Sequence, residues 1–180
     1  MHEIETKILE IDVNSLIEKL KKIGAEKIQE VMLIVDWYGP KGLTHDGDDS
    51  WYLRVRSYGN GKIEVTCKWN KKIIGNTVQG NEVNVLVDSH EKTGTLFESI
   101  GLENYAHQEK KRISWKLDNV QFDLDTYPSM PAYLEIEAGS EKEINDMIKK
   151  LNLEHYETWN DGERTLIKEK YKLDWFNMSF

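Results

Sequence analysis

The sequence has little cysteine, proline or long apolar stretch. Its single cysteine, Cys67, excludes an internal disulfide and any metal site built from several cysteines. Only three prolines occur and no tract is of low complexity, which favours an ordered domain over a disordered chain. No segment approaches the roughly 18 to 20 apolar residues of a membrane span, and the first residues do not resemble a signal peptide. We therefore expect a cytoplasmic protein without a membrane partner, and the length predicts one domain over residues 1–180.

An excess of positive charge is also absent. The chain has 24 lysines and arginines against 32 aspartates and glutamates, so its net charge is −8. This balance argues against a general electrostatic grip on nucleic acid, which needs a basic surface. A local basic site for phosphate groups is still compatible with it, so the distribution of charge along the chain becomes the informative feature.

Alternation of apolar and polar residues is the dominant pattern, and it predicts β-strands with one buried face. Strands are expected over residues 2–10, 29–38, 51–58, 62–69, 78–87, 107–117, 120–126 and 133–138. Helices are expected over residues 14–23 and 89–100, from the capping box at 140–143 onward, and in the tail at 163–173. In the second helix the expected buried stripe is Leu96, Phe97 and Ile100.

Charged side chains gather on one face of these strands, because residues two apart in a strand share a face. The basic side chains on this face are Lys7, Arg54, Arg56, Lys68, Lys110 and Arg112. The acidic ones are Glu3, Glu5, Asp123, Asp125, Glu135 and Glu137, with Glu82 on the fifth strand. An ordinary solvent-facing sheet is the alternative for any single strand. The apolar stripes of the helices, however, need apolar sheet faces to cover, which would turn the charged faces inward.

Closure of these strands into a barrel would remove exposed sheet edges. We therefore expect an α+β protein, mainly antiparallel β, built as a closed eight-stranded β-barrel tunnel with helices packed outside. A charged interior is costly unless its charges are paired or bind a charged ligand. Carboxylates suit Mg²⁺ or Mn²⁺, and bases suit phosphate. Both together suit a polyphosphate with its divalent metal ion.

The order of these motifs resembles that of the CYTH superfamily, the triphosphate tunnel metalloenzymes. The first five-residue segment of the match, Glu-Ile-Glu-Thr-Lys at 3–7, is similar to the ExExK signature of the family. The strands with Arg54 and Arg56 and with Lys110 and Arg112 resemble its Arg-x-Arg and Lys-x-Arg strands. Lys68, Glu82, Asp125 and the pair Glu135 and Glu137 also stand in the order that the family shows. Gly80 departs from the pattern, because the family usually has a basic residue there.

The resemblance implies a tunnel that binds a small-molecule triphosphate and one or two divalent metal ions, Mg²⁺ or Mn²⁺. It assigns the metal to Glu3, Glu5, Asp125, Glu135 and Glu137, with Glu82 as an additional candidate. It assigns the phosphate oxygens to Lys7, Arg54, Arg56, Lys68, Lys110 and Arg112. The expected catalytic residues are Glu5, Lys7 and Asp125.

Members of the family include inorganic tripolyphosphatases, thiamine triphosphatases and class IV adenylyl cyclases. We expect metal-dependent hydrolysis of a triphosphate, either inorganic tripolyphosphate or an organic or nucleoside triphosphate. The alternative is conversion of ATP to cyclic AMP and pyrophosphate, and a second alternative is a non-catalytic module that binds polyphosphate or nucleotide. The sequence leaves the substrate open, and a homodimer is compatible with it.

Overall fold

The computed structural model describes residues 4–42, 51–74 and 77–180, with side chains for all of these except 70–74 and 77–80. Contacts group the chain into two units. Unit 1 holds Met1–Val31 and Lys110–Leu173, and unit 2 holds Met32–Glu109 and Asp174–Phe180. Strands β2 (Glu26–Pro40) and β6 (Leu102–Leu117) pass from one unit into the other. Among the helices in these ranges, none is long and apolar enough to cross a membrane.

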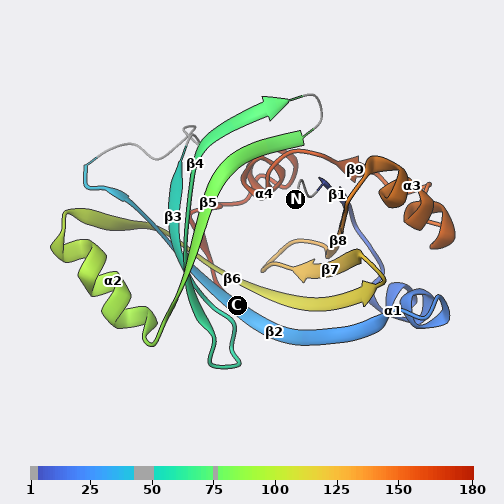
Figure 1. Ribbon diagram of the computed structural model, residues 1–180, viewed down its shortest axis with the longest axis horizontal. Helices are drawn as coiled ribbons and strands as arrows, with labels where there is room; N and C mark the ends of the chain where they lie inside the picture. Colours follow the sequence, from blue (N-terminus) through green and yellow to red (C-terminus); the bar gives the residue numbers. More distant parts are fainter. Residues whose placement is uncertain (1–3, 43–50, 75–76) are drawn as a thin grey trace. The chain divides into compact units, whose positions relative to one another are not determined.

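Unit 1 is a sheet with helices on one face. Its strands follow the hydrogen-bonded order β6-β7-β8-β1-β9, and every neighbouring pair is antiparallel (Figure 1). Besides its parts of β2 and β6, the unit contains β1 (Ile4–Ile8), α1 (Val13–Lys22), β7 (Val120–Thr126), β8 (Tyr133–Ala138), α3 (Glu141–Lys150), β9 (Thr158–Trp159), α4 (Glu163–Thr165) and the π-helix η1 (Leu166–Lys170). The helical tail predicted at 163–173 is confirmed in α4 and η1.

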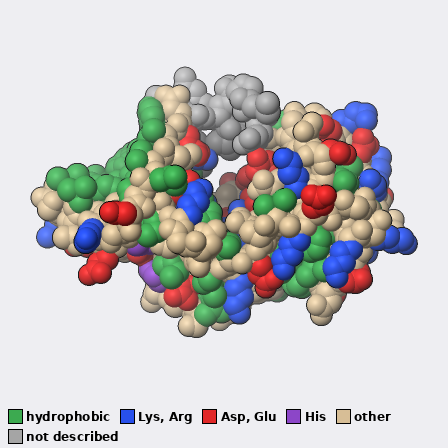
Figure 2. Space-filling view, turned by 60° about the horizontal axis from the view of Figure 1, so that its bottom comes forward, with side chains coloured by type: hydrophobic (Ala, Val, Ile, Leu, Met, Phe, Trp, Pro, Cys, Tyr) green, Lys and Arg blue, Asp and Glu red, His purple; other side chains and the backbone are tan. Residues whose placement is uncertain are grey.

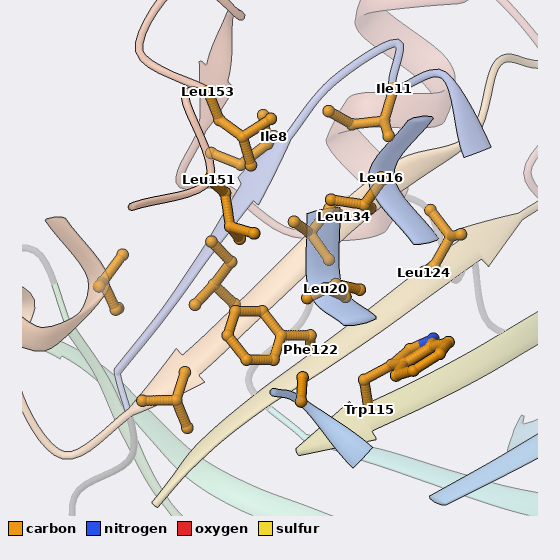
Figure 3. Packing of buried hydrophobic residues seen from close by; sticks show 14 of the residues in the cluster. Ile8, Ile11, Leu16, Leu20, Trp115, Phe122, Leu124, Leu134, Leu151 and Leu153 are labelled. Carbon is orange, nitrogen blue, oxygen red and sulfur yellow. The ribbon is translucent and has the colours of Figure 1, made fainter. Parts of the chain in front are cut away.

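The apolar core of unit 1 lies between the sheet and the helices α1 and α3. Phe122 on β7 and Leu134 on β8 are fully buried. Leu20 of α1, Ile144 of α3 and Leu151 directly after α3 belong to the same cluster (Figure 3). The prediction that helices cover the apolar face of these strands is therefore confirmed for unit 1. Since side chains alternate along a strand, the charged residues of β1, β6, β7 and β8 lie on the opposite face.

The ends of α1 and α3 follow from local sequence. Asp12 caps α1 by accepting a hydrogen bond from the backbone N–H of Ser15 at 2.6 Å. Gly24 ends the helix with a φ of +84°, a conformation that favours glycine. The predicted capping box is confirmed at α3, where the Ser140 hydroxyl accepts from the Glu143 backbone and donates to its carboxylate.

Unit 2 contains an antiparallel sheet in the order β5-β4-β3-β2 and one helix. Its elements besides β2 and β6 are β3 (Tyr52–Ser57), β4 (Ile63–Ile74), β5 (Thr77–Val87), α2 (His90–Ser99) and β10 (Asn177–Met178), which pairs in parallel with β6. The predicted turn between β3 and β4 is confirmed, because Gly59 and Gly61 have φ values of +68° and +90°.

Helix α2 packs differently from the prediction. Its buried residues are Thr93 and Gly94, whereas Leu96 and Ile100 are 58% and 68% exposed. The helix approaches β2 so closely that a Cβ at Gly94 would lie 2.5 Å from the hydroxyl of Tyr38. A large side chain cannot occupy that contact, so Thr93 and Gly94 face the sheet while Leu96 and Ile100 face outward. Phe97 of the predicted stripe does pack on the sheet, with its ring centre 5.2 Å from that of Tyr38. Figure 2 shows hydrophobic side chains gathered on the surface over α2.

A carboxylate shared by two histidines fixes the first turn of α2 to the sheet. Asp36 of β2 lies 2.7 Å from His90 at the start of α2 and 2.7 Å from His107 of β6. His90 also contacts the hydroxyl of Ser57 on β3 at 2.7 Å. Burial alone would raise the pKa of Asp36, but the hydrogen bonds with both imidazoles lower it below its usual value.

The expected closed barrel of eight strands is not what the structure has. The hydrogen-bonded order begins at β5 and ends at β9, and ten strands take part among the described residues. Strands β9 and β10 were not predicted, because each has only two residues and shows no alternation of its own. The α+β class and the antiparallel character of the sheet are confirmed.

The packing of α1 and α2 predicts that a leucine-to-alanine substitution destabilises the protein more in α1 than in α2. Leu20→Ala in α1 removes a fully buried side chain, and we expect it to lower the free energy of unfolding by about 2–5 kcal/mol. Leu96→Ala in α2 is expected to change it by less than about 1 kcal/mol, because that side chain is already exposed. Chemical denaturation of both variants measures the difference. Equal losses would contradict the outward orientation of Leu96.

Candidate functional site

The charged face of unit 1 brings predicted site residues from four strands into register. Glu5 lies opposite Glu137, and Lys7 lies opposite Glu135, across the β1–β8 pair. Asp123 on β7 is the next neighbour of Glu135. Arg112 of β6 lies opposite Asp125 of β7. The strand register therefore places acids and bases side by side on one surface.

Lys7 is almost fully buried between two carboxylates. Its residue is 2% exposed, and its ammonium lies 3.0 Å from Glu5 and 3.4 Å from Glu135. Burial disfavours the charged form, but the charges of Glu135 and Glu5 outweigh it and raise the pKa of Lys7. Lys7 is thus a fixed cation at neutral pH and is not available as a proton acceptor.

Asp125 joins the two basic residues of β6. It is fully buried, accepts two hydrogen bonds from the Arg112 guanidinium at 2.5 and 2.6 Å, and lies 2.8 Å from the Lys110 ammonium. Arg112 also contacts Asp123 at 2.7 Å. Burial alone would raise the pKa of Asp125, but Arg112 and Lys110 lower it. A bidentate arginine pair of this kind fixes the orientation of both groups.

A further carboxylate joins this group from the C-terminal part of unit 1. Glu163 of α4 contacts the Lys110 ammonium at 2.5 Å. It also accepts hydrogen bonds from the hydroxyls of Tyr127 and Tyr133, both at 2.7 Å. The Tyr133 hydroxyl also lies 3.2 Å from the Asp125 carboxylate. None of these three residues, Glu163, Tyr127 and Tyr133, is among the site residues predicted from the sequence.

Two carboxylates of the face repel each other. Burial, followed by the charge of Glu5, raises the pKa of Glu135 to about 7, even though Lys7 and Arg112 act in the opposite direction. Such a pair has the donor chemistry of a site for Mg²⁺ or Mn²⁺, whose preferred ligands are carboxylate oxygens. Within the residues that the structure describes, no three acidic, histidine or cysteine side chains converge as a ready-made metal cage. Glu3, another predicted metal ligand, lies outside the described residues.

The predicted phosphate-binding residues of unit 2 also lie on one sheet face. Arg56 contacts Glu64 at 2.9 Å, and the hydroxyl of Tyr58 donates to the same carboxylate at 3.1 Å. Lys62 lies 2.9 Å from the second oxygen of Glu64. Burial alone would raise the pKa of Glu64, but hydrogen bonds from Lys62 and Arg56 lower it to about 2. The Nε atom of Arg56 is buried and has no hydrogen-bond partner in the described part of the chain.

The other predicted phosphate-binding residues of unit 2 are Lys68 and Arg54. Lys68 of β4 pairs with Glu82 of β5, directly opposite it in the register. The Arg54 guanidinium lies 5.5 Å from the ring centre of Trp37 and 5.4 Å from that of Tyr52. These distances are typical of cation–π contacts. The side chains predicted on β3, β4 and β5 therefore share one surface within unit 2.

The missed residues differ in how visible they are in the sequence. Tyr133 lies two residues before Glu135, so strand alternation alone places it on the charged face. Glu64 lies opposite Arg56 in a predicted hairpin and follows from the same rule. Glu163 belongs to a three-residue helix that shows no periodicity, and nothing in the sequence indicates that it reaches Lys110.

Comparison with known proteins finds a matching family and similar proteins. The CYTH domain family model matches residues 1–165. A protein of Methanocaldococcus jannaschii, named as a candidate adenylate cyclase, is 26% identical over 174 residues, which cover 95% of this chain and 97% of the relative.

Solved structures share the fold. A conserved hypothetical protein from Pyrococcus furiosus superposes with a TM-score of 0.73 at 21% identity, covering 92% of this chain and 99% of the other. A Hippeastrum protein, described as a candidate adenylyl cyclase with dominant triphosphatase activity, superposes with a TM-score of 0.66 at 13% identity, covering 94% and 96%.

The raised pKa of Glu135 predicts how stability depends on pH. The folded protein holds this proton up to about pH 7, whereas an unfolded glutamate loses it near 4.5. The stabilisation by the protonated form is complete below pH 4.5 and is lost as the pH rises through 7. We expect the melting temperature of the metal-free protein to fall over this range more steeply than that of Glu135→Gln. Parallel profiles from calorimetry would contradict the shift.

Proposed function

This chain belongs to the CYTH domain family, and on that premise we propose that it hydrolyses a small-molecule triphosphate with the help of a divalent metal ion. The observation that carries the proposal is the unit 1 face, where buried cations and buried carboxylates alternate on adjacent strands. A triphosphate needs bases for its oxygens, and its metal ion needs acids. A surface with only acidic or only basic side chains could not bind both the triphosphate and its metal ion.

The acidic residues fit a metal ion that is shared with its ligand. Mg²⁺ is commonly held by one or two protein carboxylates together with phosphate oxygens and water. Glu5 and Glu135 match that requirement, because their mutual repulsion is what a cation would relieve. Glu137 lies opposite Glu5 in the register and is a third candidate. When bound, Mg²⁺ or Mn²⁺ neutralises phosphate charge and polarises the bond to be broken.

The basic residues fit the phosphate chain. Arg112 has a planar guanidinium held by Asp123 and Asp125, so its orientation is set before a ligand arrives. In unit 2, the buried Nε–H of Arg56 is a donor without a partner among the described residues, and a phosphate oxygen would satisfy it. Arg54, Lys68 and Lys110 are assigned the same role, with Glu82 positioning Lys68.

The proposed reaction breaks one phosphoric anhydride bond. Water attacks the terminal phosphorus, its proton passes to a carboxylate or to solvent, and a diphosphate leaves. Lys7, held charged by Glu5 and Glu135, stabilises negative charge on the transferring group or on the leaving group. Asp125 remains a candidate metal ligand and catalytic residue in this proposal, and its contacts also position Arg112 and Lys110.

Adenylate cyclase activity is the second candidate, and the name of the Methanocaldococcus jannaschii relative favours it. In that reaction the ribose 3′-hydroxyl attacks the α-phosphorus of ATP, and pyrophosphate leaves. Both reactions use the same bases and acids. The Hippeastrum protein, whose description names triphosphatase activity as dominant, supports hydrolysis as the first choice.

Incubation of the purified protein with Mg²⁺ or Mn²⁺ and with tripolyphosphate, ATP or thiamine triphosphate separates the candidates. We expect orthophosphate as a product, together with pyrophosphate when tripolyphosphate is the substrate. Formation of cyclic AMP and pyrophosphate from ATP would contradict the proposed hydrolysis and show that the protein is a cyclase. No product from any substrate, with binding still detected by calorimetry, would overturn both enzymatic proposals.

Loss of one acidic charge is expected to stop turnover without unfolding the protein. Glu5→Gln keeps the size of the side chain but removes one charge from the pair with Glu135, so we expect kcat to fall by at least about 100-fold. Glu18→Gln is the matched control, because that side chain is 74% exposed on α1. Steady-state assays with circular dichroism check both variants. Wild-type turnover in Glu5→Gln would remove Glu5 from the site.

Loss of the Arg56 guanidinium is expected to weaken substrate binding. Arg56→Ala removes the unpartnered buried Nε–H and the charge, so KM for the triphosphate should rise by about tenfold or more. Arg56→Lys retains the charge without the planar donors and should recover only part of the loss. KM and kcat equal to those of the wild type in Arg56→Ala would place this residue outside the phosphate-binding set.

A further inference from the structure

Glu163 is held against the charged face by the segment that carries it. The segment before it is tied to β1 through a 2.6 Å hydrogen bond between Thr6 and Asn160. The segment after it is anchored by Leu166 and Ile167, which are fully buried. The backbone at Glu163 is therefore fixed on both sides, and only its side chain is left to rotate.

Three buried donors converge on the Glu163 carboxylate. The hydroxyls of Tyr127 and Tyr133 donate to its two oxygens, each at 2.7 Å. The Lys110 ammonium contacts it at 2.5 Å. The exposed fractions of Tyr127, Tyr133 and Lys110 are 2%, 0% and 6%, so these donors turn away from bulk water. Two neutral hydroxyl donors and one ammonium around a single anionic group are also what a phosphate oxygen pair requires.

The charge of Glu163 is stabilised by this environment. Burial alone would raise its pKa, but the charge of Lys110 and the hydrogen bonds lower it well below the usual value. Lys110 has Asp125 as a second carboxylate partner at 2.8 Å. One anion is therefore enough to neutralise Lys110, and Glu163 is a second one that another anion can replace.

We propose that Lys110, Tyr127 and Tyr133 form an oxyanion subsite that Glu163 fills in the ligand-free protein, and that one phosphate group of a phosphate-chain ligand takes the place of this carboxylate. This inference rests on the proposed function in that the ligand is the triphosphate or its product. Displacement needs only rotation of the Glu163 side chain, because the backbone on both sides of it is held by Thr6 and by the buried residues Leu166 and Ile167.

The internal carboxylate lowers the apparent affinity of the subsite for added anions. A ligand binds only the fraction of molecules in which the subsite is open, so its apparent dissociation constant rises as that fraction falls. Removal of the Glu163 charge should raise the fraction of molecules in which the subsite is open. The subsite then selects ligands whose phosphate binding is strong enough to displace the carboxylate.

Calorimetric titration with inorganic pyrophosphate, in the presence of a chelator, tests the inference without metal or turnover. Glu163→Gln is expected to bind pyrophosphate about tenfold more tightly than the wild type. Glu169→Gln is the matched control, because it makes the same charge change on the same segment at an exposed position, and it should bind like the wild type. Equal or weaker binding by Glu163→Gln would overturn the inference.

Thermal melting covers the case in which Glu163 serves only to hold the fold. Inorganic phosphate should raise the melting temperature of Glu163→Ala more than that of the wild type, because phosphate fills the position left by the carboxylate. Adding Tyr127→Phe to Glu163→Ala should reduce that gain, since it removes a hydroxyl that donates to Glu163 in the wild type. A loss of stability in Glu163→Ala that phosphate does not restore would show a purely structural carboxylate.

The outcomes separate this inference from the proposed hydrolysis. Tripolyphosphate turnover by the wild type, without tighter pyrophosphate binding in Glu163→Gln, retains hydrolysis and removes the subsite. Tighter pyrophosphate binding in Glu163→Gln, with no turnover of any triphosphate by the wild type, retains the subsite and removes hydrolysis.

Discussion

Buried positive charge is the constraint on which the site of unit 1 depends. Lys7 and Lys110 are almost fully buried, and the Arg112 side chain is only 14% exposed. Cations in such surroundings are tolerated when carboxylates pair with them closely. The neighbouring strands supply those carboxylates through Glu5, Asp123, Asp125 and Glu135, and α4 adds Glu163. Lys7 and Lys110 each contact two of these carboxylates, so the pairs form one connected set.

The opposite face of the same sheet makes this set possible. Phe122 and Leu134 pack with α1 and α3, and that packing holds the strands in one register. A slip of one residue would turn every charged side chain into the apolar core. The register therefore brings Lys7 opposite Glu135 and Arg112 opposite Asp125. In this way an ordinary apolar core determines which acids meet which bases.

Strand alternation predicted much of this arrangement from the sequence. It placed the acidic and basic residues of β1, β6, β7 and β8 on one face, and the same rule covers Tyr133 and Glu64. Helical periodicity was right about Phe97 of α2, which packs on Tyr38, but wrong about Leu96 and Ile100, because it did not reveal the close contact between Gly94 and Tyr38. The prediction of closure was wrong, because alternation describes one strand at a time and does not say which strand edges pair. Alternation placed Asp125 on the charged face, but only tertiary structure shows its contacts with Arg112 and Lys110.

The sequence by itself determined the fold class, the sidedness of the strands and the resemblance to the CYTH family, because these depend on short-range order along the chain. Tertiary structure alone decided which charges neutralise each other, why Glu135 holds its proton to about pH 7 and why Glu163 reaches Lys110. Those properties depend on distance and burial. Residues 53 positions apart in the chain, such as Lys110 and Glu163, become neighbours only after the sheet and the C-terminal segment have packed.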